Sequence, residues 1–417
     1  MITILILFLL ILLGAPLFAV IAAGAFWSFY QADIDLQAMV IEFNGIAEMP
    51  ILLAIPLFTF AGYMLSESKA PERMVRLTSA LMGWMPAGLA IVSLVACAFF
   101  TAFTGASGVT IIALGAILFP AMQKAGYPNK FNLGLVTSAG SLGLLFAPSL
   151  PLILYGVIAE VPIADLFLAG LLPGFLMLLI LSGYSIWKNR AIRVPLGYFS
   201  WQEVRSALRE SVWEIPLPIV VLGGVYSGYF AISEAAAVTA LYVLIIDVLI
   251  LKEVSFKKLP AIIRESMILV GGIMLILGVS RASTNFMIDA GVPQQMLEWI
   301  SGFVSSEIAF MMMLLVFLLV LGAILDIFSA IVLVVPLILP VGIQFGIDPI
   351  HLGIVFLATM QLGYITPPVG LNLFIAGYRF DRSIVEVYLS TLPFFFLLLV
   401  SVLLIAFWPA LSLVLLS

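Results

Sequence analysis

Twelve apolar stretches, separated by short charged or Gly/Pro-containing breaks, constrain this chain more than any other feature. They lie at about 2–13, 15–30, 49–66, 92–122, 131–156, 166–187, 213–230, 232–251, 265–284, 306–345, 351–378 and 387–415. Of the residues, 64% are hydrophobic and only 9% are charged. Because backbone polar groups cannot be satisfied by lipid, apolar stretches of this kind span membranes as helices. The sequence therefore predicts an all-α polytopic membrane protein.

Two of the stretches, 92–122 and 306–345, are longer than one crossing of a ~30 Å hydrocarbon core requires. Each has small or polar residues near its middle, "FTAFTGASGVT" in the first and "LGAILDIFSA" in the second. We therefore predict that each is a re-entrant hairpin, which enters and leaves the membrane by the same face.

Two other stretches contain proline where a membrane helix should be continuous. They read "SLGLLFAPSLPLILYG" at 141–156 and "LGYITPPVGLNLFIAG" at 362–377. Proline removes a helical hydrogen bond, and the freed carbonyl groups can be satisfied only where they line a protein cavity. We therefore predict two broken helices, each contributing to a binding site.

The hairpins and the broken helices recur at a constant spacing. At an offset of 220, the sequence pairs Pro120 with Pro340, Gly126 with Gly346, Leu142 and Gly143 with Leu362 and Gly363, Pro148 with Pro368, and Leu172 and Pro173 with Leu392 and Pro393. Earlier in each half the offset is 222, which pairs Pro71 with Pro293 and Met74 with Met296. This pattern predicts an internal repeat.

The positive charges predict how the chain is oriented. With ten crossings, two hairpins and both termini outside, the inner segments 67–76, 123–130, 188–212, 252–264 and 379–386 hold every Lys and Arg except Arg281. This distribution follows the positive-inside rule. The two hairpins then enter from opposite faces, so the repeat is inverted, an arrangement typical of secondary transporters.

Oxygen-bearing residues at the hairpin tips and breaks are the candidate ligands for a small cation. Hydroxyl and carbonyl oxygens suit a hard cation, and a carboxylate at membrane depth is costly and usually functional. The first candidate site consists of Thr104, Gly105, Ser107, Ser141, Gly143 and Pro148; the second consists of Asp326, Ser329, Gly363, Thr366 and Pro367.

Other chemistries find little support in the sequence. There is no phosphate-binding glycine loop and no Cys/His cluster, so we predict neither an enzyme nor a resident cofactor. The "GASG" at 105–108 matches the serine motif of intramembrane proteases, but the single histidine, His351, is predicted at the outer end of a later span. A serine nucleophile needs its base within hydrogen-bonding reach, so a protease remains an alternative, as does a channel.

The segment "LGGVYSGYFAISEAAAV" at 222–238 resembles a signature of the large membrane subunit of tripartite ATP-independent periplasmic (TRAP) transporters. "ALGAILFPAM", "LLFAPSLPLILYG" and "LGYITPPVGLNLFIAG" also resemble that family, and the likeness covers essentially the whole chain. It differs in the first tip, T-G-A-S-G-V-T, and in having Ala147 where the family often has proline.

The resemblance implies an elevator-type sodium symporter for organic acids in the bacterial inner membrane. Residues 1–91 and 188–305 would contain the scaffold helices and arms, with arm helices at 31–48 and 285–304, and residues 92–187 and 306–417 would form the mobile transport unit. A stand-alone sodium–carboxylate or anion symporter of the same superfamily is the alternative.

The resemblance also implies two partners, a small four-helix membrane subunit and a periplasmic substrate-binding protein. The substrate would be a carboxylate, such as a C4-dicarboxylate or a sialic acid, coupled to sodium ions. Hydroxyl, amide and guanidinium groups are suitable donors to a carboxylate. The candidate substrate ligands are Ser107, Ser149, Asn372 and Arg281.

Overall fold

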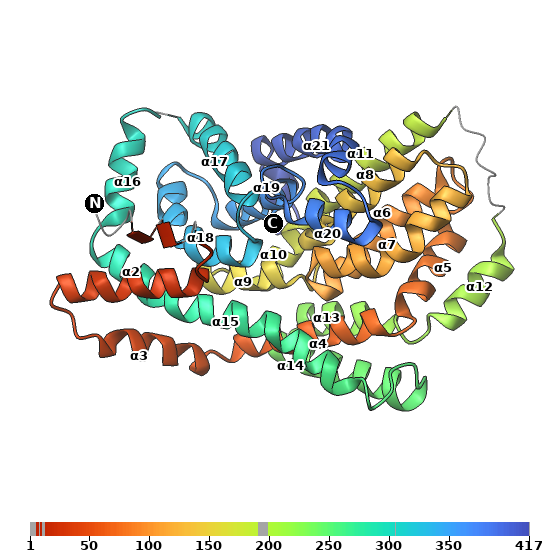
Figure 1. Ribbon diagram of the computed structural model, residues 1–417, viewed down its shortest axis with the longest axis horizontal. Coiled ribbons are helices and arrows are strands. Elements are labelled where there is room, and N and C mark those ends of the chain that lie inside the picture. Colours follow the sequence, from red (N-terminus) through yellow and green to blue (C-terminus); the bar gives the residue numbers. More distant parts are fainter. Residues whose placement is uncertain (1–5, 8, 11–12, 191–198, 305, 417) are drawn as a thin grey trace.

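The computed structural model describes residues 6–7, 9–10, 13–190, 199–304 and 306–416, and this part of the chain is helical without strands (Figure 1). Seven of its helices are long and apolar enough to cross a membrane, or eight if the bent pair 129–145 and 150–159 counts as one span. The predicted all-helical membrane fold is therefore confirmed. The predicted first span, 2–13, falls mostly outside the described residues.

A layer of helices lies along the lower side of Figure 1. It contains α2 (Leu17–Gln31), α3 (Gln37–Gly45), α4 (Ala54–Glu67), α13 (Pro216–Tyr226), α14 (Ile232–Leu244) and α15 (Leu259–Asp289). Helix α4 packs on α14, and α15 packs on α2, α3 and α4. With 31 residues, α15 is about 46 Å long at 1.5 Å per residue, enough to cross the bilayer at a tilt.

The two long apolar stretches each form a pair of helices joined by a short turn. The first pair is α6 (Gly88–Thr104) and α7 (Ser107–Lys124), and the second is α17 (Glu307–Gly322) and α18 (Ile327–Gln344). The turns fall at the "TGAS" and "AILD" segments, where glycine, N-cap residues and small side chains end one helix and begin the next.

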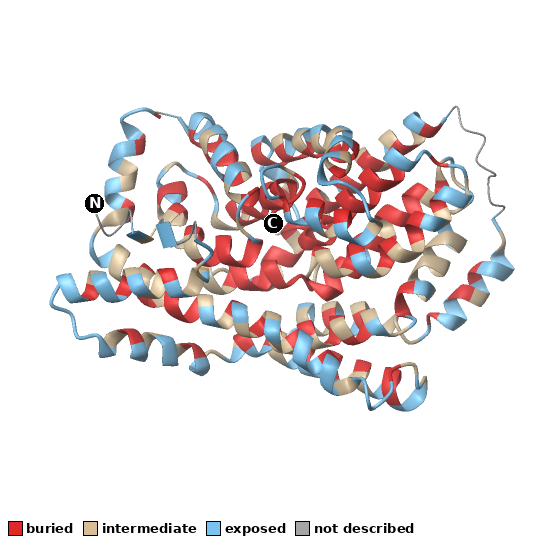
Figure 2. Cartoon of the chain, viewed as in Figure 1, coloured by how far each residue is buried: buried red, intermediate tan, exposed pale blue. Residues whose placement is uncertain are grey.

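The proline-containing stretches are broken where the sequence predicts. Helix α8 (Asn129–Ala139) is followed by a 3₁₀ turn, η3 (Leu142–Leu145), and then by α9 (Leu150–Ala159), at a bend of 42°. In the second half, α19 (Pro349–Gly363) gives way to α20 (Leu371–Phe380). Figure 2 shows that buried residues are concentrated around these elements rather than in the lower layer. The broken helices therefore form the core.

The order of elements recurs along the chain. Helices α6, α7, α8 and α9 begin at residues 88, 107, 129 and 150, and α17, α18, α19 and α20 begin at 307, 327, 349 and 371. These starts are 219 to 221 residues apart, close to the offset of 220 read from the sequence. Two further helices, α11 (Leu171–Asn189) and α21 (Ile384–Phe407), follow the broken helices in the two halves.

Four of the described helices, each of thirteen residues or fewer, fall in segments that the sequence analysis did not treat as spans. Helices α3 and α16 (Val292–Ser301) lie in the segments predicted as arm helices. Two others, α5 (Ala70–Met82) and α12 (Trp201–Glu210), fall largely in segments that the sequence analysis treats only as charged inner segments. They remain helical because each has a polar and an apolar face, which a search for membrane spans does not detect.

Ion pairs join three of the five predicted inner segments. Arg73 on α5 bonds to both Glu214 and Glu253, and Arg76 bonds to Glu203 at 2.9 Å. Burial tends to raise the pKa of Glu253, but hydrogen bonds from Arg73 and from the backbone N–H of Lys69 hold that pKa below its usual range. The network joins α5 to α12, to the segment before α13 and to the segment that follows α14.

Candidate functional site

The first hairpin tip lies directly against the first break. Gly105 ends α6 with a φ of 65°, a conformation that favours glycine. At the break, a Cβ atom on Gly143 would lie 2.2 Å from the carbonyl oxygen of Ala98 on α6. Glycine at 143 thus allows the backbone of the break to touch the hairpin.

Buried hydroxyl groups gather at this contact. The Thr101 Oγ1 donates to the carbonyl oxygen of Gly140 at 2.8 Å and lies 2.7 Å from the Thr110 Oγ1. Ser141 is also buried, and the buried Oγ of Ser138 has no hydrogen-bond partner among the described residues. Hydroxyl and carbonyl oxygens of this kind can coordinate a hard cation.

Thr101, Ser138 and Gly140 are absent from the sequence-based site. A signal for Thr101 was present, because it lies three residues before Thr104 and so on the same face of a helix. The meeting of Thr101 with Gly140 could not be foreseen, since it depends on how the hairpin packs on the break. Of the predicted residues, Thr104 and Ser107 lie at this tip and are buried.

At the second tip, Asp326 is the N-cap of α18. Its Oδ1 accepts hydrogen bonds from the backbone N–H groups of Phe328 and Ser329, both at 3.0 Å. Its Oδ2 accepts a short hydrogen bond from the Ser329 hydroxyl group. The residue is exposed on the isolated chain. Asp326 therefore combines a capping role with a carboxylate presented at the hairpin tip.

The second tip also contacts the break of its own half. A Cβ atom on Gly363 would lie 2.5 Å from the backbone carbon of Gly322. The backbone N–H groups of Val369 and Gly370 donate to the carbonyl oxygen of Ala323, each at 3.1 Å. The predicted residues Thr366 and Pro367 lie in this break, Thr366 half-buried and Pro367 exposed.

A hydrogen-bonded chain joins the two halves. The Ser107 hydroxyl group on the first tip donates to the Asn372 Oδ1 at 2.8 Å, and the Asn372 Nδ2 donates to the carbonyl oxygen of Thr137 at 3.3 Å. Helix α7 also packs on α20, while α18 packs on α9. Two of the four predicted substrate residues, Ser107 and Asn372, therefore meet although 265 residues separate them.

The other two predicted substrate residues are placed differently. Ser149 is buried just after the first break, and its Oγ has no hydrogen-bond partner among the described residues. Arg281 lies on α15, where its Nε donates to the Glu42 Oε2 at 3.1 Å and an Nη donates to the sulfur of Met49. Arg281 thus makes its polar contacts with the arm segment that contains α3 and not with Ser107 or Asn372.

The arrangement does not support serine protease or transition-metal chemistry. The Ser107 hydroxyl group is bonded to Asn372, whereas the His351 nitrogens lie 3.2 Å from the Ser412 Oγ and the Ala406 carbonyl oxygen. Within the described ranges, no three His, Cys, Asp or Glu side chains form a group that could hold a metal ion. What the tips and breaks offer is hydroxyl, amide, carbonyl and carboxylate oxygen.

Comparison with known proteins gives a consistent result. The family model described as "Tripartite ATP-independent periplasmic transporter, DctM component" matches residues 4–411. The C4-dicarboxylate TRAP transporter large permease protein DctM of Rhodobacter capsulatus is 31% identical over 402 residues, covering 92% of this chain and 90% of that protein. The ectoine/5-hydroxyectoine TRAP transporter large permease protein UehC of Ruegeria pomeroyi is 32% identical, covering 97% and 95%.

A further relative is the 2,3-diketo-L-gulonate TRAP transporter large permease protein YiaN of Escherichia coli, which is 29% identical, with 94% of each chain covered. Among solved structures, the YdaH transporter of Alcanivorax borkumensis matches with a TM-score of 0.58. That match covers 89% of this chain and 87% of the other at 14% sequence identity, so it supports the fold alone.

Proposed function

The chain belongs to the DctM component family of tripartite ATP-independent periplasmic transporters, and from that membership we propose that it carries an organic acid across the bacterial inner membrane by sodium-coupled symport. The observation that supports this most directly is the contact of each hairpin tip with a broken helix: buried oxygen atoms converge at the first contact, and the second presents the Asp326 carboxylate. Secondary transporters place substrate and ion sites at such breaks near the bilayer midplane.

Two sodium sites are proposed, one in each half. The first uses the oxygens around Thr101, Thr110 and Gly140, next to the predicted residues Thr104 and Ser141. The second uses Asp326 and Ser329 together with the break that begins at Gly363. Sodium is favoured over a divalent or transition metal because the ligand sets hold at most one carboxylate.

The substrate site is proposed between the halves, at Ser107, Asn372 and Ser149. Ser107 and Asn372 face each other across the repeat, and the unpartnered Ser149 hydroxyl group is a further hydrogen-bond donor. The Ser149 hydroxyl group and the second N–H of the Asn372 amide can donate to a carboxylate directly, and Ser107 can do so when its hydroxyl group turns away from Asn372. Bound sodium ions would balance the negative charge of the carboxylate. For Arg281 to bind the substrate carboxylate, its ion pair with Glu42 would have to break during transport.

The partners follow from the family. We propose a small membrane subunit and a periplasmic substrate-binding protein, with the arginine-rich inner segments in the cytoplasm. Relatives are named for C4-dicarboxylate, for ectoine and for diketogulonate, so the substrate is proposed only as a class, a small organic acid or a zwitterion that bears a carboxylate.

An elevator motion is proposed because the two halves pack differently on the helix layer. Of the arms of the first hairpin, α4 packs mainly on the first arm, α6. Its counterpart in the repeat, the C-terminal half of α15, belongs to a helix that packs on the second arm of the second hairpin, α18. If the hairpins and broken helices move as one unit between two positions along the helix layer, then in either position the two halves of the repeat contact that layer differently.

This asymmetry predicts a contact in the other position. At present a Cβ atom on Gly62 would lie 2.6 Å from the Cα of Thr104. The counterparts of Gly62 and Thr104 in the second half are Thr284 and Ala323, at offsets of 222 and 219.

We expect the double variant T284C/A323C, with Cys97 replaced by Ala, to form a disulfide during turnover and to lose uptake until it is reduced. The pair T284C/G183C should not crosslink, and equal crosslinking of both pairs would contradict the motion.

Uptake by reconstituted protein tests the proposed function itself. In proteoliposomes that contain this chain and its small subunit, we expect uptake only with a binding protein and an inward sodium gradient. By calorimetry, substrate affinity should rise steeply with sodium at constant ionic strength, because an anion would otherwise approach Asp326 uncompensated. Uptake without any binding protein would favour the stand-alone symporter, and uptake that ignores the sodium gradient would refute the coupling.

A further inference from the structure

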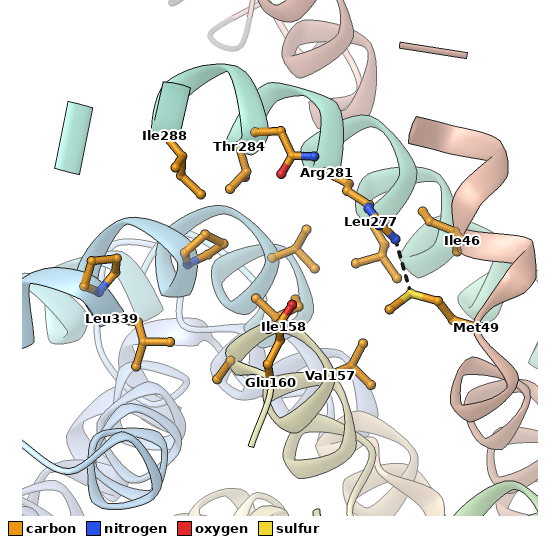
Figure 3. Close-up of a pocket in the computed structure, with 15 residues that line it drawn as sticks. Ile46, Met49, Val157, Ile158, Glu160, Leu277, Arg281, Thr284, Ile288 and Leu339 are labelled. Carbon is orange, nitrogen blue, oxygen red and sulfur yellow. Dashed lines mark hydrogen bonds between the residues drawn. The ribbon is translucent and has the colours of Figure 1, made fainter. Parts of the chain in front are cut away.

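A cavity of about 380 Å³ lies between the helix layer and the second hairpin, away from the proposed substrate site. Its walls come from the segment after α3, the end of α9, the C-terminal part of α15 and the middle and C-terminal part of α18 (Figure 3). Ser107, Ser149 and Asn372 do not line it. The cavity is therefore a separate feature of the molecule.

The cavity lies toward the C-terminal ends of three helices. Helix α9 ends at Ala159, α15 at Asp289 and α18 at Gln344, and the residues lining the cavity lie within about three turns of these three ends. Because a membrane-spanning helix ends near the level of the lipid headgroups, a ligand in this cavity would have its polar part near these helix ends and its apolar part deeper in the bilayer.

The lining is divided into an apolar part and a polar part. The apolar wall is formed by Ile46, Met49, Val157, Ile158, Ala159, Leu277, Ile288, Val332, Pro336, Leu339 and Pro340. The polar residues are Arg281, Thr284 and Asn285, which lie on one face of α15, and Glu160 at the end of α9. Figure 3 shows Arg281 and Glu160 entering from these two different elements. The cavity thus presents a cation and an anion beside a larger apolar surface.

Arg281 keeps hydrogen-bonding capacity for a ligand. Its Nε is used by Glu42 and one Nη by Met49, while a guanidinium group has five N–H donors. Glu42 pairs with Arg281 but does not line the cavity. A phosphate group would match the remaining donors, and the Glu160 carboxylate would accept hydrogen bonds from a primary ammonium group.

We propose that this cavity binds a membrane phospholipid with an amine-bearing headgroup, its phosphate at Arg281, its ammonium group at Glu160 and part of its acyl chain along α18. A purely anionic lipid would place no cation opposite Glu160, and a quaternary ammonium headgroup has no N–H to donate. Because the ligand contacts both the helix layer and the second hairpin, bound lipid stabilises their packing.

The test compares lipids on the purified complex of this chain with its small subunit, stripped of lipid in detergent. Palmitoyl-oleoyl-phosphatidylethanolamine, -phosphatidylglycerol and -phosphatidylcholine are titrated, with bound lipid counted by native mass spectrometry and the thermal midpoint recorded. We expect the ethanolamine lipid to bind about tenfold more tightly than the other two, a difference of about 1.4 kcal/mol. Water-soluble glycerophosphoethanolamine should bind far more weakly, because it lacks the acyl chain.

Three variants locate the site. R281Q and E160Q should each remove the preference for the ethanolamine lipid, and E160Q should fold normally because Glu160 is exposed at a helix end. E42Q is the matched control: it breaks the same ion pair as R281Q but leaves the guanidinium group in the cavity, so the preference should persist. Equal binding of the three lipids, or the same loss in E42Q as in R281Q, would overturn the proposal. Binding does not depend on transport, so its failure would leave the proposed symport untouched.

Discussion

Replacing Asp326 with Asn is expected to abolish sodium-coupled uptake while leaving the protein folded. Asn caps a helix about as well as Asp, so D326N should preserve the bonds from the Phe328 and Ser329 N–H groups to the Oδ1. It removes the negative charge that we assign to the second sodium site, and it replaces the Oδ2 that accepts from the Ser329 hydroxyl group with an amide nitrogen that can donate to that hydroxyl group instead. Uptake in proteoliposomes and the sodium dependence of the thermal midpoint measure the two effects separately.

Two further variants separate charge from capping. D326A loses the cap as well as the charge, and the cap alone is worth about 1 kcal/mol, so it should be less stable than D326N but equally inactive. Asp348 caps α19 through the N–H groups of Ile350 and His351 in the same way, outside the hairpin tips, so D348N should transport normally. If D326N took up substrate with normal sodium coupling and only D326A failed, Asp326 would be a capping residue alone.

Replacing Gly143 with Ala is expected to have the largest structural effect. The added Cβ would lie 2.2 Å from the Ala98 carbonyl oxygen and 2.6 Å from the Ala102 nitrogen. Both are backbone atoms of α6, which cannot rotate away, so the break must move off the hairpin. Overpacking of this kind typically costs about 1–3 kcal/mol. We expect a lower thermal midpoint, a weaker stabilisation by sodium and no uptake.

Gly183 provides the matched control. It lies on α11, and a Cβ there would meet no atom within 4 Å. Alanine also favours a helix interior over glycine by about 1 kcal/mol, so G183A should be at least as stable as the native chain and fully active. The counterpart variant G363A, whose Cβ would lie 2.5 Å from the Gly322 backbone, should behave like G143A. Normal uptake by G143A would mean that the first break does not need its contact with α6.

The sequence by itself determined that the chain is built of apolar helices, where the helical pairs and the breaks fall, and that the order of elements recurs. The reason is that these features follow from local rules: lipid cannot satisfy a polar backbone, and proline cannot continue a helix. The same rules made Asp326 a candidate site residue, because a carboxylate within an apolar stretch can be recognised from the sequence alone. Helices α5 and α12 were missed because their amphipathic pattern is too polar for a span.

Only the tertiary structure decided which side chains meet. Ser107 reaches Asn372, and Thr101 reaches Gly140, because the hairpin arms pack on helices far away in the chain. Arg281 stands alone among the basic residues in the sequence, yet in the fold it pairs with Glu42. Such contacts depend on the rotation and offset of packed helices, and a hydropathy pattern specifies which residues avoid water but not which neighbour each one finds.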